Sequence, residues 1–254
     1  MRTSVIRTLG ILTGIILITG IVGISASAAP PEKTPPDIKK IVFIHKEKPG
    51  KAAKPDKGGK PPKEGEVEGC DGYKLMRLRG NFVKWGSTPV EWEVNTSASG
   101  LNNADAIAAL KMAFDEWDDG TYSGWGGVSV NLYVNEPSST NAVAADLDGE
   151  RSLVWEDLDA GVIASTSLWM STLTGEIVDA DIRFNTDFDW SSSGEAGKMD
   201  LLNIAVHEIG HFGGMFHPNN EYYNESMYRY SELGEIIKRD LCDGDQEGIT
   251  KLYR

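Results

Sequence analysis

The chain has 254 residues, 40% of them hydrophobic, and a formal net charge of −13. Residues 70–254 carry the acidic excess, with 13 basic residues against 31 acidic ones, whereas residues 30–69 hold 10 lysines against 7 acidic residues. Nucleic-acid binding needs clustered lysine and arginine, so the acidic charge of residues 70–254 argues against it. The length of this segment is enough for one domain with a hydrophobic core.

Residues 1–29 have the pattern of a targeting segment. Two arginines precede an apolar run at residues 9–24, and small residues follow at 26–28. The pattern is typical of a cleaved signal peptide, and the run is short for a membrane span of about 20 residues. We expect a secreted, extracellular or cell-surface protein, in contact with a membrane only if the segment stays uncleaved as an N-terminal anchor.

Residues 30–69 are predicted to be a Lys/Pro-rich linker or short pro-segment without stable structure. So polar a stretch buries too little apolar surface to offset the entropy cost of ordering it. Its one apolar run is Ile-Val-Phe-Ile at residues 41–44. That run adds a strand to a sheet edge, occupies a cleft, or is an apolar patch in a disordered tail, and we favour the last interpretation.

The remaining chain, residues 70–254, is predicted to be one α+β domain, because most strands precede the late helices. Strands are expected where β-branched and alternating residues gather, and helices where apolar residues recur at helical spacing. The expected strands are 90–95, 128–134, 152–155, 163–169 and 177–185, and the expected helices are 103–117, 201–212, 234–238 and 243–253. Asp200 is the expected cap of the second helix, 201–212.

The second expected helix, 201–212, carries a metal-binding pattern. Residues 207–217 read His-Glu-Ile-Gly-His-Phe-Gly-Gly-Met-Phe-His, which holds three of the four histidines of the chain. His207 and His211 lie a turn apart on one helix face, and Gly214 allows a sharp turn that returns His217 to them. Three histidines suit a catalytic zinc, which keeps a fourth position for water.

Two further residues have predicted roles beside the zinc. Glu208 follows the first histidine, so it points past the metal and can act as general base toward its water. Met227 is interpreted as an apolar floor under the metal, or else as a flexible residue filling a core gap. A five-residue match alone can arise by chance in an amphipathic helix, but the glycine and third histidine at the required offsets argue against chance.

With these residues in place, the chain resembles the metzincin metalloproteases, most closely their matrixin-type branch. The similar segments also include residues 84–85, 90–95, 108–117, 175–185 and 245–253. The resemblance implies a zinc-dependent endopeptidase that cleaves protein or peptide substrates. It also implies a twisted mixed β-sheet with an active-site helix and a C-terminal helix.

In such a fold, extended substrates pair with an exposed strand edge, which the resemblance places at residues 161–169. Ala164, Ser165 and Thr166 then line the cleft, or they are ordinary edge-strand residues. Two alternatives to proteolysis stay open. One is a cell-surface binding module with a zinc site but no turnover, against which Glu208 argues, and the other is a zinc hydrolase acting on a non-peptide bond.

The sequence offers residues for two other kinds of ion site. His45 is the only histidine outside the motif, so a histidine-rich structural zinc is not expected. Calcium is possible because clustered aspartates supply the oxygens it prefers, although no calcium-loop pattern matches and solvated surface aspartates are the favoured interpretation. The aspartates concerned are Asp146, Asp148, Asp179, Asp181, Asp187 and Asp189.

The two cysteines, Cys70 and Cys242, predict a disulfide that ties the start of the domain to its last helix. The resemblance offers another interpretation, in which Cys70 belongs to a pro-segment and caps the zinc. The sequence Glu-Gly-Cys-Asp-Gly at residues 68–72 does not match the family's motif for that role.

Overall fold

The computed structural model describes residues 35, 37–49, 70–118 and 131–254. The predicted targeting segment, much of the linker and the start of the strand expected at 128–134 lie outside these residues. Among the described residues, the helices fall short of the length and apolar content that a membrane span requires.

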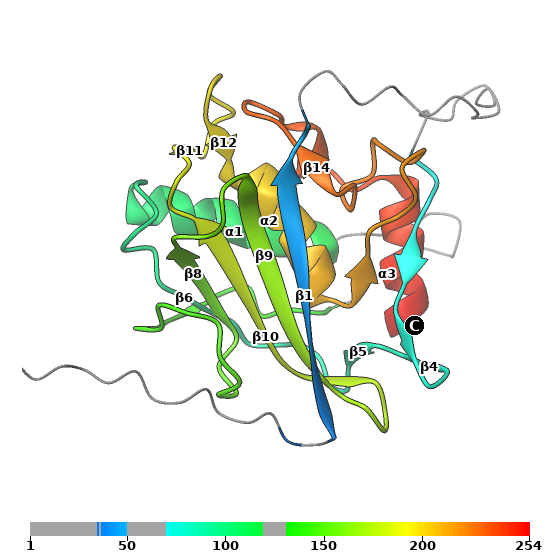
Figure 1. Cartoon of the computed structure of the whole chain (residues 1–254). Helices are drawn as coiled ribbons and strands as arrows, with labels where there is room; N and C mark the ends of the chain where they lie inside the picture. The colour runs from blue at the N-terminus through cyan, green and yellow to red at the C-terminus, as the bar shows by residue number, and fades with distance from the viewer. Residues whose placement is uncertain (1–34, 36, 50–69, 119–130) are drawn as a thin grey trace, which may run out of the picture. The chain divides into compact units, whose positions relative to one another are not determined.

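The main sheet is mixed. Its order is β14-β1-β9-β10-β8-β6-β7, with β5 also paired to β10. Strands β1, β9 and β10 are antiparallel neighbours, whereas β8 is parallel to β10 and to β6 (Figure 1). The strands are β1 (Ile38–Glu47), β5 (Lys84–Trp85), β6 (Glu93–Val94), β7 (Ser138–Ser139), β8 (Ser152–Glu156), β9 (Val162–Ser171), β10 (Glu176–Asn185) and β14 (Tyr230–Ser231).

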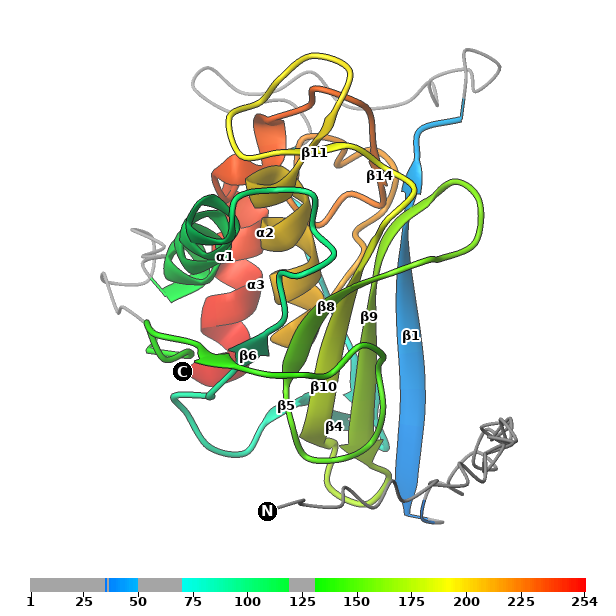
Figure 2. The ribbon, with the colours of Figure 1, turned by 90° about the vertical axis from the view of Figure 1, so that its left-hand side faces the viewer.

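Three helices lie to one side of this sheet (Figures 1 and 2). They are α1 (Asn103–Asp118), α2 (Leu201–Phe212) and α3 (Asp243–Tyr253), with a 3₁₀ turn η2 (Ile237–Arg239) before α3. The short two-stranded pairs are β2 (Lys74–Leu75) with β13 (Met215–Phe216), β3 (Arg77–Leu78) with β4 (Asn81–Phe82), and β11 (Trp190–Ser191) with β12 (Met199–Asp200). This arrangement confirms the predicted α+β class.

Helix α2 runs through the core, and aromatic side chains fix its position. The indole of Trp117 on α1 donates to the carbonyl oxygen of Val206 at 2.8 Å, and that of Trp85 donates to Phe212 at 2.9 Å. The hydroxyl of Tyr253 on α3 donates to Gly213 at 2.8 Å. The last carbonyls of a helix lack partners within it, so the donors from Trp85 and Tyr253 stabilise the end of α2, while Trp117 holds the middle of the helix.

Most expected elements form where the sequence predicted them, and the differences have local causes. The strand expected at 90–95 is reduced to Glu93–Val94, because Val90 instead exchanges backbone hydrogen bonds with Leu132 and Val134. The helix expected at 234–238 is only the turn Ile237–Arg239.

The larger correction concerns β1. A disordered tail was favoured for this part of the chain, yet Ile38–Glu47 forms a ten-residue strand along β9 (Figure 2). Nine paired positions with β9 and one largely buried face offset the entropy cost of ordering it. Phe43 is only 4% exposed and His45 is fully buried, so this strand belongs to the core on one face.

Candidate active site

The site begins with the cap of α2. Asp200 accepts a hydrogen bond from the backbone N–H of Asn203 at 3.0 Å, as expected of an N-cap, and Arg239 binds its carboxylate with two nitrogens at 2.8 and 2.6 Å. The helix then presents His207 and His211 on one face, and both side chains are fully buried.

The chain turns back after α2 at Gly214, whose φ of +96° is unfavourable for residues with a side chain. Strand β13 follows, and His217 comes directly after it. Its Nε2 atom lies 3.1 Å from Nε2 of His207 and 2.9 Å from Nε2 of His211. The structure thus brings together the three histidines that the motif predicted.

The tautomers of these rings suit a metal. Nδ1 of His207 lies 2.7 Å from the carbonyl oxygen of Ser226, and Nδ1 of His211 lies 2.9 Å from that of Met215. A carbonyl can only accept, so both protons are on Nδ1 and both Nε2 lone pairs point toward His217. Zinc bound tetrahedrally at about 2.0–2.1 Å places its nitrogen ligands roughly 3.3 Å apart. A cation between the rings resolves the lone-pair repulsion, so these residues fit zinc.

The electrostatics agree with that fit. Burial holds the pKa values of His207 and His211 well below 6.5, and burial followed by the nearby Arg229 lowers the pKa of His217 to about 4. All three rings are therefore neutral at pH 7, the state in which imidazole binds metals.

Glu208 points from α2 toward the main sheet. Its Oε2 accepts a hydrogen bond from the hydroxyl of Thr166 on β9 at 2.6 Å. Burial raises the pKa of Glu208 to about 8, while the Thr166 hydroxyl acts in the opposite direction. A cation at the adjacent imidazoles would favour the ionised form. Thr166 was expected only to line the cleft, and the structure shows that it also orients the carboxyl group.

Met227 is fully buried beneath α2. A Cβ atom added at Gly210 would come within 2.2 Å of its sulfur and 2.5 Å of the Trp117 ring. Gly210 lies between the two helical histidines, so the methionine packs directly against the turn that carries them. Its role as the floor of a metal site is supported by this packing and stays a prediction.

The structure also adds His45, which the sequence placed in a linker without a role. Nδ1 of His45 lies 3.2 Å from Oε1 of Glu208, and its ring centre lies 3.9 Å from that of His207. Two residues earlier, Phe43 stacks on His211 with ring centres 4.0 Å apart and 9° between the planes. Alternation of Ile41, Phe43 and His45 on one face of a strand was the signal available in the sequence.

The predicted substrate-strand residues lie at this place. Ala164, Ser165 and Thr166 are buried in β9 and pair with His45, Ile44 and Phe43 of β1. The edge of β9 that was expected to be open for a substrate therefore carries β1.

Two of the six aspartates proposed for calcium lie inside the domain and not on its surface. Asp179 and Asp181 are 0% and 1% exposed, so the interpretation of solvated surface groups is wrong for these two. Asp179 accepts hydrogen bonds from the backbone N–H groups of Asp148 and Gly149, at 3.0 and 2.9 Å. Burial raises the pKa of Asp181 to about 8. These bonds show a role in holding a loop, and calcium stays a prediction.

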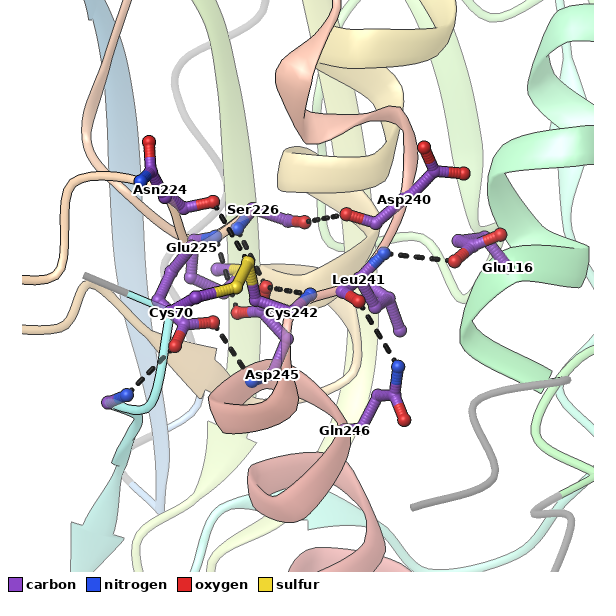
Figure 3. The surroundings of a disulfide bond; sticks show 12 residues. Cys70, Glu116, Asn224, Glu225, Ser226, Asp240, Leu241, Cys242, Asp245 and Gln246 are labelled. Atoms are coloured by element: carbon purple, nitrogen blue, oxygen red, sulfur yellow. Dashed lines mark hydrogen bonds between the residues drawn. A yellow bond between two sulfur atoms is a disulfide. The ribbon is translucent and has the colours of Figure 1, made fainter. Parts of the chain in front are cut away.

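Cys70 and Cys242 form the expected disulfide, with Cα atoms 5.2 Å apart (Figure 3). This bond uses the thiol that the alternative interpretation assigned to the metal. Beside it, Glu225 accepts hydrogen bonds from the backbone N–H groups of Gly72 at 2.8 Å and Asp245 at 3.1 Å. The disulfide and these bonds tie the beginning of the domain and α3 to the segment that leads to Met227.

Three converging imidazoles beside a buried carboxyl group are the arrangement of a metal-dependent hydrolase. The family model described as Matrixin matches residues 84–254. The chain belongs to the matrixin family, which confirms the resemblance seen in the sequence and implies zinc.

The chain is also similar in sequence to individual metalloproteinases and to karilysin. Karilysin of Tannerella forsythia is 26% identical over 180 residues, which cover 67% of this chain and 33% of karilysin. Matrix metalloproteinase-16 of Rattus norvegicus is 25% identical over 195 residues, 74% of this chain and 30% of the relative. Stromelysin-2 of Rattus norvegicus is 40% identical over 74 residues, 29% of this chain and 15% of the relative. The chain thus spans about a third of the length of the first two relatives.

Proposed function

We propose that this chain is a secreted zinc-dependent endopeptidase whose catalytic domain is residues 70–254. The observation that carries the proposal is the convergence of three Nε2 atoms, with 2.9 and 3.1 Å between His217 and the other two, while both helical histidines bond carbonyl groups through Nδ1. This leaves neutral, oriented lone pairs that meet at one point.

His207, His211 and His217 would hold a zinc ion, which would act as a Lewis acid and lower the pKa of a water molecule at the site. Glu208 accepts a proton from the attacking water through Oε1 and delivers it to the leaving amine. Thr166 fixes the other carboxyl oxygen by its 2.6 Å hydrogen bond, so that Oε1 is the oxygen left for proton transfer. The backbone of β9 would offer hydrogen bonds to an extended peptide at the edge that β1 occupies in this structure.

The proposal is tested by comparing the wild type with Glu208→Gln, which keeps the volume and the hydrogen bond to Thr166 but cannot accept a proton. Because Phe43 and His45 lie against the site, cleavage of a casein-type substrate is measured on the full chain and also on chains in which both are alanine. We expect one zinc per chain in each form, and a loss of cleavage of about 10²–10⁴-fold in Glu208→Gln.

Equal cleavage by the glutamate and glutamine forms would reject the mechanism. Zinc binding without cleavage in either background would favour the alternative of a binding module. His211→Ala is the matched control for the metal, since it removes one ligand and leaves Glu208 in place. For secretion, the mass of the exported protein gives its N-terminus, and a start near residue 30 supports a cleaved signal peptide at residues 1–29.

A further inference from the structure

The pocket beside Glu208 ends at a buried polar cluster from β14 and η2. In this structure the pocket holds the imidazole of His45, whose ring centre lies 3.9 Å from that of His207. The Nδ1 atom of this imidazole lies 3.2 Å from Oε1 of Glu208, and its Nε2 atom lies 3.1 Å from the hydroxyl oxygen of Ser231. The ring thus spans the pocket from the carboxyl group to the hydroxyl, and it shows what size of group fits there.

Lys238 of η2 stands behind that hydroxyl, and its side chain is 0% exposed. Its Nζ donates to the carbonyl oxygen of Tyr230 at 2.6 Å, to the hydroxyl oxygen of Ser231, and to Oε1 of Glu235 at 2.6 Å. The backbone N–H of Lys238 donates to Oδ1 of Asn203 on α2 at 2.8 Å, which fixes the turn against the helix. An ammonium group has three donors, so Lys238 has none left for a ligand, and Glu235 balances its charge.

The hydroxyl group of Ser231 has one bonding position left. It donates its proton to Oε1 of Glu235 at 3.0 Å and accepts from Lys238. A hydroxyl oxygen has two lone pairs, and the second one faces Nε2 of His45. The end of the pocket therefore offers one hydrogen-bond acceptor and no net charge.

The pocket lies where the side chain after the cleaved bond would enter. In the proposed mechanism Glu208 delivers a proton to the leaving amine, so the residue that carries this amine lies next to Glu208. A neutral side chain with an N–H donor completes the hydrogen bonding of Ser231. An apolar side chain leaves the buried lone pair unpaired, which weakens binding by about tenfold or more. A carboxylate would face Glu208, and a cationic side chain would face Lys238, so both are disfavoured.

We propose that Ser231, oriented by the buried ion pair of Lys238 and Glu235, selects the substrate class. The class consists of extended peptides in which the residue after the cleaved bond has a short, uncharged side chain with an N–H donor, an imidazole or a carboxamide. The proposal rests on the proposed endopeptidase function. Lys238 and Glu235 are positioning residues, because they act through Ser231.

One double variant makes the end of the pocket apolar. Breaking a buried ion pair by removing one partner is strongly destabilising, whereas replacing both partners by apolar residues is often neutral. Glu235→Leu/Lys238→Met is therefore the test variant. Glu195→Leu/Lys198→Met is the matched control, because this pair has the same spacing in the sequence, is joined at 2.9 Å, and is exposed at 56% and 35%.

The first test compares cleavage of four peptides that differ only in the residue after the cleaved bond: histidine, glutamine, leucine or glutamate. It uses the full, zinc-loaded chain with Phe43→Ala and His45→Ala, so that the pocket is free. In this parent chain and in the surface control, kcat/KM for histidine and glutamine should exceed that for leucine by about tenfold or more. In the apolar variant the ratio should fall to about one or reverse.

The ratio isolates the pocket, because a loss of folded enzyme lowers kcat/KM for every peptide by the same factor. An unchanged ratio in the apolar variant would overturn the proposal. Preference of the parent chain for glutamate would also overturn it, since Lys238 would then act as a free positive charge.

The second test does not depend on catalysis and uses residue 45 of the full, zinc-loaded chain as the occupant of the pocket. His45→Leu should lower the unfolding equilibrium constant by roughly tenfold in the wild type and in the surface control, because Ser231 loses its donor. In the apolar variant the loss should be smaller by about threefold or more, which urea unfolding of the mutant cycle measures. Equal losses in all three backgrounds would contradict the assignment of the pocket.

The two tests separate the possible failures. If no peptide is cleaved but the mutant cycle shows the coupling, the chemistry of the pocket stands and the endopeptidase function falls. If all four peptides are cleaved alike and the cycle shows no coupling, the function stands and Lys238 with Glu235 is only a structural ion pair.

Discussion

The turn at Gly214 provides a sharp test of how the third histidine reaches the site. We consider Gly214→Ala. The backbone at this position has φ of +96°, and an added Cβ would lie 2.3 Å from the carbonyl oxygen of Val83. Gly100 is the matched control, because its φ is +71° and a Cβ there meets nothing within 4 Å.

The two glycines differ in a single energetic contribution. Both alanine variants place a side chain in the left-handed region, which costs about 1–2 kcal/mol. Only Gly214→Ala also forces a backbone carbonyl to move, and overpacking of this kind costs about 1–3 kcal/mol. We therefore expect a loss of unfolding free energy of about 2–5 kcal/mol for Gly214→Ala and about 1–2 kcal/mol for Gly100→Ala.

Urea unfolding of the metal-free and zinc-loaded proteins measures these losses, and competition with a coloured chelator measures zinc affinity. Because the turn positions His217, Gly214→Ala should also bind zinc more weakly, whereas Gly100→Ala should bind it as the wild type does. Equal destabilisation by the two variants, with zinc affinity unchanged in both, would refute the reasoning.

Three further predictions concern stability. Removing zinc with a chelator should lower the melting temperature, since a ligand at 1,000 times its Kd stabilises by about 4 kcal/mol, and calorimetry should show no such shift in His211→Ala. Reducing the disulfide should lower the urea midpoint, because opening a loop of 172 residues costs about 5 kcal/mol in the loop-entropy model; an unchanged midpoint under reductant would contradict this. The third prediction concerns pH. Burial, followed by the charge of Asp245, raises the pKa of Glu225 above its usual 4.5, so the folded state keeps a proton that the unfolded chain releases. This contribution to stability is complete below pH 4.5 and is lost as the pH rises through the folded-state value. Titrating the unfolding free energy against pH should give a downward slope above pH 4.5 that is shallower in Glu225→Gln, and equal slopes would count against it.

Local signals were enough to predict the three α-helices, although the helix expected at 234–238 is only a short turn. The bounds expected for α2 and α3 are those of the structure, Leu201–Phe212 and Asp243–Tyr253, and Asp200 caps α2 as expected. A cap, an apolar period and a glycine turn all act within a few residues. The convergence of the three histidines followed from the same short-range spacing.

The surroundings of the site depend on contacts that are distant in the sequence. Phe43 and Thr166 face each other across two strands, although 122 positions separate them. The lysines of β1 hid an alternation that becomes meaningful only beside β9. The hydrogen-bond partners of His45 come from two separate segments, α2 and β14, so no local pattern could have indicated that it contacts Glu208.

The bond between Cys70 and Cys242 makes residues 70–242 a covalent ring, and α3 follows directly from its closing residue. β1 lies outside this ring, and its only covalent link to the ring is residues 48–69. One peptide-bond cut in that stretch would free the strand and leave the ring whole. A cut anywhere within the ring would leave both fragments attached to each other. A single backbone cut can therefore separate β1 covalently from the domain, whereas residues 70–242, which include the three histidines, stay covalently connected after one cut.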